Sequence, residues 1–324
     1  MRVAVLAGGR SSEHDVSLRS GASVARGLEE AGHEVVAVTI GRAGEWRAGE
    51  ESVLLEPGAG VLGADVVFPA LHGPFGEDGS VQGLLEQLDV PYVGSDVLAS
   101  ATCIDKLTLK RLFAQAGVPQ VGFVAVEERR PWRRECEGLG LPLWVKPSRL
   151  GSSVGITRVE RLEDLDAAVE LALRHDPRVI VEAAAAGLEV ECSVLGNDPE
   201  ALETSPPGQL AVNADWYDYE AKYGAGGMDL IVPAPLPEDQ LTQIRALAAQ
   251  IFALAGCSGL ARCDFFADPG GAVLVNEINT MPGFTETSVY AKLFEAGGLA
   301  YSDLCDRLVR LGIERHQKAR SYEF

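Results

Sequence analysis

The chain has 324 residues, of which 47% are hydrophobic and 23% are charged, so its composition excludes a disordered, collagen-like or coiled-coil protein. At roughly 100–200 residues per domain, this length corresponds to two or three domains. The 47 acidic residues outnumber the 28 basic ones and give a formal net charge of −19. Because such a charge repels phosphodiester backbones and anionic lipids, we expect no nucleic acid and no membrane as partner, whereas a cleft with a few basic groups can still hold a small anion.

The cysteines and the N-terminal residues favour a cytoplasmic protein. Six cysteines occur without a CxxC pair or an even ladder, which is typical of free thiols in a reducing compartment. The first apolar run ends at Ala7, which is too short for a signal peptide, and no later segment approaches the ~18 apolar residues of a membrane span. We therefore expect a cytoplasmic location.

Residues 1–104 alternate between strand-like and helical patterns. Apolar runs lie at 2–7, 33–40, 64–71 and 90–94, and helical patterns follow the first and third of these runs. This alternation predicts an open parallel sheet with ligand-facing loops at the carboxyl ends of its strands. We expect this part of the chain to be an N-terminal α/β domain.

A small central α+β domain and a C-terminal α+β domain are expected after this first one. The central domain, 105–183, begins with a helix and is predicted to contain a further helix at 163–175 and strands at 121–126, 141–146 and 178–183. The C-terminal domain, 184–324, is predicted to contain helices at 238–255 and 299–311 and strands near 188–195, 210–213, 260–267 and 272–278. Residues 314–324 have the composition of a solvated tail.

A metal site is predicted where two alternating apolar runs flank the turn sequence DPGG at 268–271. A period of two places Arg262 and Asp264 on one side of the first strand, and Glu277 and Asn279 on one side of the second. Two carboxylates and an amide oxygen, with no His or paired thiolates nearby, are the donors that Mg²⁺ takes alongside substrate phosphates. The alternative is a solvated hairpin face.

Two other segments are candidates for a nucleotide site. In 143–156 an apolar run contains Lys146 and is followed by a Gly- and Ser-rich loop, whose backbone N–H and hydroxyl groups could close over phosphate. A surface turn has the same pattern. In 179–187 an apolar strand runs into Glu182, which with Glu189 could accept from amino or ribose hydroxyl groups, although an edge strand with a charged end also fits. The chain contains no GxxxxGK[ST] segment, and the loop after the first predicted strand, with Gly8-Gly9, lacks GxGxxG.

Further candidates lie in loops. Glu13 follows the first predicted strand, His72 lies at the carboxyl end of another, and Lys222 and Tyr223 belong to a tyrosine-rich loop. Each has a structural alternative, because Glu13 could cap the next helix, His72 could be a hydrogen-bonded turn residue, and the tyrosines could pack. Taken singly, none of these residues identifies a function.

Taken together and in this order, the motifs resemble the D-alanine:D-alanine ligase family of the ATP-grasp superfamily. The resemblance covers nearly the whole chain and rests on the segments LAGGRSSEHDVSLRSG, ALHGPFGEDGSVQGLLE, PYVGSDVLASATCIDK, VKPSRLGSSVGI, YDYEAKY, ARCDFF and NEINTMPGFTETS. It implies an ATP-grasp fold of three domains, with ATP between the central and C-terminal domains and two D-alanines against the N-terminal domain.

The resemblance also implies an activity. ATP would phosphorylate the carboxylate of the first D-alanine, and the amine of the second would attack the acyl phosphate through a tetrahedral intermediate, giving a dipeptide for peptidoglycan precursors. The implied cofactors are ATP, two Mg²⁺ or Mn²⁺ ions and K⁺, and the implied assembly is a homodimer. Such a reaction depends on positioning and on neutralising phosphate and oxyanion charge.

The matching positions take their metal and nucleotide roles from the resemblance. The metal ligands would be Asp264, Glu277 and Asn279. The phosphate contacts would be Lys106, Lys146, Ser152 and Ser153. The adenine and ribose contacts would be Glu182, Ala185 and Glu189.

The resemblance implies further roles around the two D-alanines. Glu13 would hold the first ammonium group, and His72 would lie near the first carboxylate. Ser288 would hold the second carboxylate. Arg262 and the N–H of Gly283 would stabilise the oxyanion of the tetrahedral intermediate.

A triad of Tyr223, Ser152 and Glu13 would close the site, and Lys222 would lie beside it in the acceptor loop. Because this loop retains Tyr223 and Lys222, the resemblance favours D-alanine over D-lactate as the acceptor. The general base for the second amine stays open among His72, Tyr223 and phosphate itself.

Two positions depart from the family pattern, since Leu150 replaces a common Glu in the lid loop and Ala183 replaces a common Lys beside the adenine. The side-chain contacts made there by relatives are therefore in doubt. Two alternatives remain, which are the same chemistry with D-lactate or D-serine as acceptor, and a catalytically silent ATP-binding module. The complete metal set with Arg262 favours an enzyme, and the lack of GxGxxG after the first predicted strand argues against a nicotinamide dehydrogenase.

Overall fold

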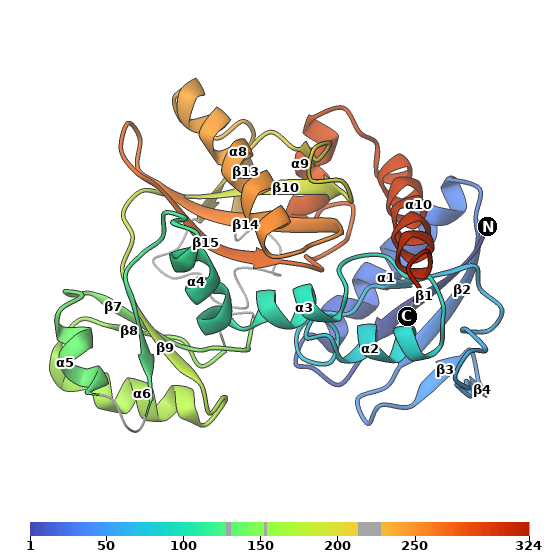
Figure 1. Cartoon of the computed structure of the whole chain (residues 1–324), viewed down its shortest axis with the longest axis horizontal. Coiled ribbons are helices and arrows are strands. Elements are labelled where there is room, and N and C mark those ends of the chain that lie inside the picture. Colours follow the sequence, from blue (N-terminus) through green and yellow to red (C-terminus); the bar gives the residue numbers. More distant parts are fainter. Residues whose placement is uncertain (128–130, 152–153, 213–227, 324) are drawn as a thin grey trace.

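The computed structural model describes residues 1–127, 131–151, 154–212 and 228–323. These residues form three units, each built on one β-sheet (Figure 1). The N-terminal unit lies at the right of the view, the central unit at the lower left, and the third unit above them.

The N-terminal unit contains a sheet in the order β4-β3-β2-β1-β5. Its strands are β1 (Arg2–Gly8), β2 (Glu34–Ile40), β3 (Trp46–Ala48), β4 (Glu51–Ser52) and β5 (Val66–Pro69), and its helices are α1 (His14–Glu30), α2 (Ser80–Gln87) and α3 (Val97–Ile104). Parallel pairing of β1 with β2 and β5 confirms the predicted parallel sheet. The antiparallel edge formed by β3 and β4 is not predicted from the sequence, and the predicted strand at 90–94 is reduced to a bridge between Val67 and Tyr92.

The central unit contains an antiparallel sheet in the order β6-β9-β7-β8. Its strands are β6 (Phe123–Val126), β7 (Leu143–Pro147), β8 (Thr157–Val159) and β9 (Val179–Ala183), and its helices are α4 (Lys106–Gln115), α5 (Trp132–Glu137), the 3₁₀ helix η1 (Leu162–Asp164) and α6 (Leu165–Leu173). Leu143 and Val145 are the buried alternate residues of β7, and they join one apolar cluster with Leu165 and Val169 of α6. This packing fixes which β7 side chains, including Lys146, point away from the α6 side.

The third unit contains an antiparallel sheet in the order β13-β12-β10-β14-β15, with β11 paired to β10. Its strands are β10 (Leu188–Gly196), β11 (Glu203–Thr204), β12 (Gly208–Val212), β13 (Met228–Ile231), β14 (Gly259–Ala267) and β15 (Val273–Asn279), and its helices are α8 (Glu238–Leu254), α9 (Val289–Ala296) and α10 (Tyr301–Arg320). The predicted hairpin is confirmed, because β14 and β15 are antiparallel and the N–H of Gly271 donates to the Asp268 carbonyl over 2.7 Å.

The last helix corrects one expectation. Residues 314–320 belong to α10 and are not a solvated tail. This helix packs on α1 and β5 of the N-terminal unit, and Arg320 donates to Asp89 over 2.7 Å (Figure 1). The close approach needs glycine at Gly27 of α1, because a Cβ there would lie 2.7 Å from the ring of Tyr301.

One buried apolar cluster extends across the N-terminal and third units. It includes Val3 and Phe68 of the first sheet together with Leu260, Tyr290 and Leu308 from β14, α9 and α10. A shared core of this kind resists relative motion of the two units. It therefore holds the loops that follow β1 and β5 in a fixed relation to the third sheet.

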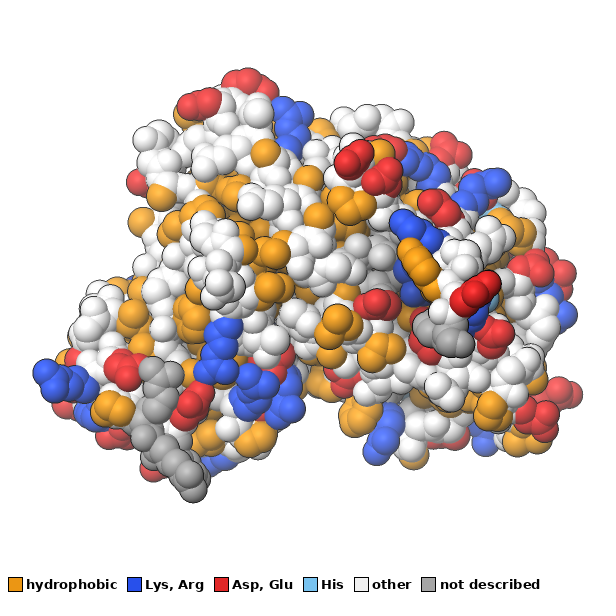
Figure 2. Space-filling model, in the orientation of Figure 1, with side chains coloured by type: hydrophobic (Ala, Val, Ile, Leu, Met, Phe, Trp, Pro, Cys, Tyr) orange, Lys and Arg blue, Asp and Glu red, His pale blue; other side chains and the backbone are white. Residues whose placement is uncertain are grey.

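The surface carries charged side chains of both signs. On the face shown in Figure 2, acidic side chains are spread over the molecule with basic side chains among them.

All six cysteines are buried and free, as predicted. Among the described residues, no helix combines the length and the apolar character needed to cross a bilayer.

Candidate active site

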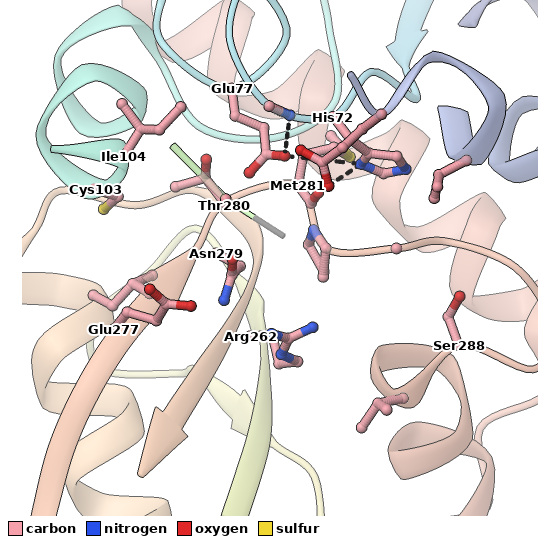
Figure 3. A pocket seen from close by; sticks show the side chains of 18 of the residues that line it. His72, Glu77, Cys103, Ile104, Arg262, Glu277, Asn279, Thr280, Met281 and Ser288 are labelled. Atoms are coloured by element: carbon pink, nitrogen blue, oxygen red, sulfur yellow. Dashed lines mark hydrogen bonds and ion pairs between the residues drawn. The ribbon is translucent and has the colours of Figure 1, made fainter. Parts of the chain in front are cut away.

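A cavity of about 410 Å³ is lined mostly by loops of the N-terminal unit and by strands and loops of the third unit, with Lys106 and Leu150 from the central unit (Figure 3). In the view of Figure 3, His72 and Glu77 lie on one side of it, Arg262 and Asn279 on the other, and Ser288 at its far right. The cavity brings together most of the candidate residues of these two units. Its lining includes Glu13, His72, Lys106, Arg262, Glu277, Asn279, Gly283 and Ser288.

Strand register places three carboxylates in a row on one face of the third sheet. Glu191 on β10 pairs with Asp264 on β14, which pairs with Glu277 on β15. Arg262 donates to Asp264 through hydrogen bonds of 2.8 and 2.7 Å, and its Nε lies 2.9 Å from Glu191. A guanidinium group is thus held between two carboxylates. We call Glu191, Arg262 and Asp264 the arginine cluster.

The predicted metal ligands meet in this row. Asp264 and Glu277 are direct partners across the hairpin, and Asn279 donates from its amide nitrogen to Asp264 over 3.1 Å. Their oxygen donors fit a hard divalent cation such as Mg²⁺ in chemistry. Within the described ranges there is no group of three or more His, Cys, Asp and Glu side chains that could hold a metal ion.

Lys106 links this row to the start of α4. Its ammonium group donates to the carbonyl of Leu150 over 2.8 Å and lies 3.5 Å from Glu277. The Asp105 side chain caps α4 by accepting from the N–H of Thr108, which fixes the helix end that carries Lys106. The backbone of Leu150 thus contacts the site even though its side chain differs from the family pattern.

Glu13 is 7% exposed and lies against Gly73. A Cβ at Gly73 would lie 2.5 Å from the Glu13 carboxylate, and Gly73 has a φ of +70°. The positive φ favours glycine at this position, and a Cβ there would force the Glu13 carboxylate to move. Because β1 and β5 are parallel neighbours, the loops that follow them leave the same edge of the sheet, which is why Glu13 and His72 meet.

Both ring nitrogens of His72 are engaged. Nδ1 lies 3.0 Å from the carbonyl of Met281, so it must donate, and Nε2 lies 2.8 Å from the hydroxyl of Ser20, from which it accepts in the neutral ring. Burial lowers the pKa of His72, although the nearby Glu13 carboxylate opposes this shift. The histidine is therefore neutral with a hydrogen bond at each ring nitrogen, and a proton taken up at Nε2 would reverse the bond with Ser20.

Glu77 is a cavity residue that the sequence reasoning did not single out. Its Oε1 accepts from the N–H of Gly73 over 2.7 Å and lies 3.9 Å from Nδ1 of His72. Burial, reinforced by repulsion from Glu13, raises the pKa of Glu77 well above its ordinary value. The only sequence signal for it is its place in the segment HGPFGEDG, which reads as a turn.

Gly283 and Ser288 lie together at another wall of the cavity. A Cβ at Gly283 would lie 3.3 Å from the hydroxyl of Ser288. That hydroxyl accepts from the N–H of Thr285 over 2.9 Å, and Ser288 immediately precedes α9. The N-terminus of a helix favours a carboxylate ligand, which is consistent with the role predicted for Ser288.

Apart from Lys106, the described candidate nucleotide residues do not line this cavity, and Lys146 and Glu182 lie on the central sheet. Lys146 on β7 lies 2.6 Å from Glu182 on β9, which also lies 2.9 Å from Lys110 of α4. The sequence reasoning did not single out Lys110, although it stands on the buried face of α4 between Leu107 and Phe113. We call Lys110, Lys146 and Glu182 the glutamate cluster.

The Glu182 carboxylate is ionised in this cluster. Burial opposes its ionisation, but the two ammonium groups outweigh burial and lower the pKa of Glu182 to about 2. Its side chain faces the lysines, so a contact with adenine or ribose would fall to its backbone. Ala185 is half-buried in the loop after β9, and Glu189 is exposed on β10.

Ser152, Ser153, Lys222 and Tyr223 lie outside the described residues. The predicted lid contacts, the triad of Tyr223, Ser152 and Glu13, and the acceptor loop therefore stay predictions. The roles of the residues in the cavity are likewise predictions, to which the geometry adds their proximity.

Comparisons with known proteins agree along the whole chain. A family model described as D-ala D-ala ligase N-terminus matches residues 2–57 and 55–95, and one described as D-ala D-ala ligase C-terminus matches residues 112–310. A D-alanine–D-alanine ligase of Deinococcus radiodurans is 45% identical over 337 residues, covering 97% of this chain and 98% of its own length. One of Thermoanaerobacter sp. is 42% identical over 357 residues, covering 99% of each chain.

Solved structures agree with these sequence matches. The D-alanine-D-alanine ligase of Coxiella burnetii has a TM-score of 0.88 at 34% identity, covering 99% of this chain and 96% of its own. The VanG D-Ala:D-Ser ligase of Enterococcus faecalis has a TM-score of 0.87 at 34% identity, covering 96% and 99%. The expected ATP-grasp fold, with an N-terminal open parallel sheet followed by two α+β units, is thereby confirmed, and the chain belongs to the D-alanine–D-alanine ligase family.

Proposed function

We propose that this protein joins two molecules of D-alanine into D-alanyl-D-alanine, with cleavage of ATP to ADP and phosphate, for peptidoglycan precursor synthesis. The observation that carries the proposal is the cavity in which Glu13, Arg262, Glu277 and Ser288 meet. These residues come from motifs far apart in the sequence, in a chain that relatives named D-alanine–D-alanine ligase match over nearly their whole length.

The reaction needs two group transfers. A carboxylate oxygen of the first D-alanine attacks the γ-phosphorus of ATP and ADP leaves, which turns a poor electrophile into an acyl phosphate. The amine of the second D-alanine then attacks the carbonyl carbon, the bond to phosphate breaks, and the amine loses a proton. The protein must neutralise phosphate charge in the first transfer and oxyanion charge in the second.

The chain offers basic groups for both transfers. We assign Lys106 and Lys146 to the phosphates, and Arg262 with the N–H of Gly283 to the oxyanion. Two Mg²⁺ or Mn²⁺ ions bound by Asp264, Glu277 and Asn279 would neutralise further phosphate charge. Because Arg262 is held by carboxylates on two sides, it is oriented before substrate arrives, and such preorganisation is what makes charge stabilisation effective.

We assign Glu13 to the ammonium of the first D-alanine and Ser288 to the carboxylate of the second. The bonding of His72 favours a role in shaping the wall of the cavity near the first carboxylate over a role as general base, because both of its nitrogens are engaged. Of the open candidates for that base, Tyr223 and phosphate then remain.

Finer features of the proposal rest on the family. They are K⁺ as an additional cofactor, a homodimer, a cytoplasmic location and a division into domains at 1–104, 105–183 and 184–324. D-Alanine is the proposed acceptor because the chain carries Lys222 and Tyr223 in the acceptor loop. A structural neighbour named as a D-Ala:D-Ser ligase makes D-serine the acceptor to compare with it.

The test is an assay of the purified protein with ATP, Mg²⁺ and D-alanine in which ADP and D-alanyl-D-alanine are both measured. We expect the two products in equal amounts. Parallel reactions with D-serine or D-lactate added, at neutral and alkaline pH, distinguish the acceptors, since an amine must be in its free-base form to attack. Phosphate release that does not depend on D-alanine, or ATP binding without turnover, would overturn the proposal.

A further inference from the structure

The glutamate cluster joins three elements of the central unit. Lys110 comes from α4, Lys146 from β7 and Glu182 from β9, and the two ion pairs measure 2.9 and 2.6 Å. The side chains of Lys110 and Glu182 are each 2% exposed, whereas that of Lys146 is 14% exposed. Lys146 is therefore the member of the cluster that a ligand can reach.

The charges of the cluster do not cancel. Two ammonium groups and one carboxylate leave a formal charge of +1. Burial favours the neutral amine of Lys146, but Glu182, and at longer range Glu277 and Glu189, outweigh burial and raise the pKa of Lys146. Lys146 and Glu182 are thus charged at neutral pH, and Lys146 carries its positive charge at the accessible end of the cluster.

We propose that Lys110 is a positioning residue for nucleotide binding, which neutralises Glu182 so that the charge of Lys146 stays available to the phosphates of ATP. The inference rests on the proposed function, because it takes Lys146 as a phosphate contact. Without Lys110, Glu182 would be compensated by Lys146 alone, and an approaching phosphate would meet a pair with no net charge. Lys110 is too deeply buried to touch the ligand itself.

The proposal differs from a purely structural role for Lys110 in one measurable way. Replacing Lys110 by Met removes the surplus charge, whereas replacing Lys110 by Met and Glu182 by Gln together restores it on Lys146. If charge is what matters, the second substitution reverses the effect of the first. If Lys110 only fills space and bridges α4 to the sheet, the second substitution adds damage.

The experiment measures the dissociation constant of Mg·ATP by isothermal titration calorimetry, without D-alanine, for the wild type, K110M, K110M/E182Q and the control K318M. Lys318 is an exposed lysine of α10, so K318M is the same substitution outside the site. We expect K110M to weaken ATP binding about tenfold, as expected for one charge acting over several ångströms in a partly buried site. We expect K110M/E182Q to recover to within about threefold of the wild type, and K318M to match it.

Two outcomes would overturn the inference, namely wild-type affinity in K110M, or a double variant that binds no better than K110M. Where K110M does not fold, K110Q replaces it, because glutamine removes the same charge and keeps a donor for the Glu182 carboxylate. Failure of the proposed function looks different, since the wild type itself would then bind no ATP or form no dipeptide.

Discussion

The arginine cluster and the glutamate cluster are built in opposite ways. In the arginine cluster one cation, Arg262, lies between the carboxylates of Glu191 and Asp264. In the glutamate cluster one carboxylate, Glu182, lies between two ammonium groups. The first has a formal charge of −1 and includes the predicted metal ligand Asp264. The second has a formal charge of +1 and includes the predicted phosphate contact Lys146.

This difference teaches how an acidic protein can hold both a cation and a polyanion. Buried charges are stable only when they are paired, so the sign of each cluster is set by which partner is in excess. The excess carboxylate favours a divalent cation, and the excess lysine favours phosphate. The net charge of −19 is therefore no guide to the local charge at either place.

The largest expected effect comes from removing a predicted metal ligand next to the arginine cluster. Glu277→Gln keeps the shape of the side chain but removes a carboxylate beside the arginine cluster, so turnover should fall by about a thousandfold or more. The rate of ADP formation measures this, and an unchanged melting temperature shows that the fold is intact. A variant as active as the wild type would mean that the metal site is placed wrongly.

The next effect concerns the stability of the glutamate cluster. Glu182→Gln leaves two buried ammonium groups close together without their carboxylate, so the free energy of unfolding should fall by about 3–5 kcal/mol. Urea unfolding of E182Q measures it, with E295Q as the control, because Glu295 forms an exposed ion pair with Lys292. Equal losses in both variants would contradict a special role for the buried pair.

The pH dependence of stability tests the same carboxylate. Because the pKa of Glu182 is lowered from 4.5 to about 2 in the folded protein, its stabilising contribution is present above pH 4.5 and is lost as the pH falls towards 2. The wild type should therefore lose more stability than E182Q over this range. Melting curves of both proteins between pH 7 and pH 3 check it, and two parallel profiles would refute the assignment.

The smallest of these effects is expected from a change within the arginine cluster itself. Glu191→Gln weakens the contact that orients Arg262 and reduces the negative charge of the cluster, so kcat should fall about tenfold and more Mg²⁺ should be needed for half-maximal rate. The KM for ATP should stay near that of the wild type, because the glutamate cluster is untouched. A change confined to the KM for ATP would show that Glu191 acts elsewhere.

Local patterns predict the hairpin with its metal ligands, because alternation and a DPGG turn fix which side chains share a face. Glu191 could not be found this way, since its place beside Asp264 depends on the pairing of β10 with β14 across a long stretch of chain. The burial of Lys110 is hard to predict from the sequence for another reason. A lysine in an amphipathic helix normally faces water, and only its position between Leu107 and Phe113 indicates burial.

The return of α10 to the N-terminal unit has a consequence for synthesis of the chain. Val3 and Phe68 of the first sheet share their buried cluster with Leu308 and Val309 of α10. During translation, which adds ~5–20 residues per second, the first sheet emerges long before the helix that covers it. The nascent chain therefore presents a partly uncovered apolar face, to which Val24 and Leu28 of α1 have been added, until α10 leaves the ribosome. The first unit to be made is among the last to be completed.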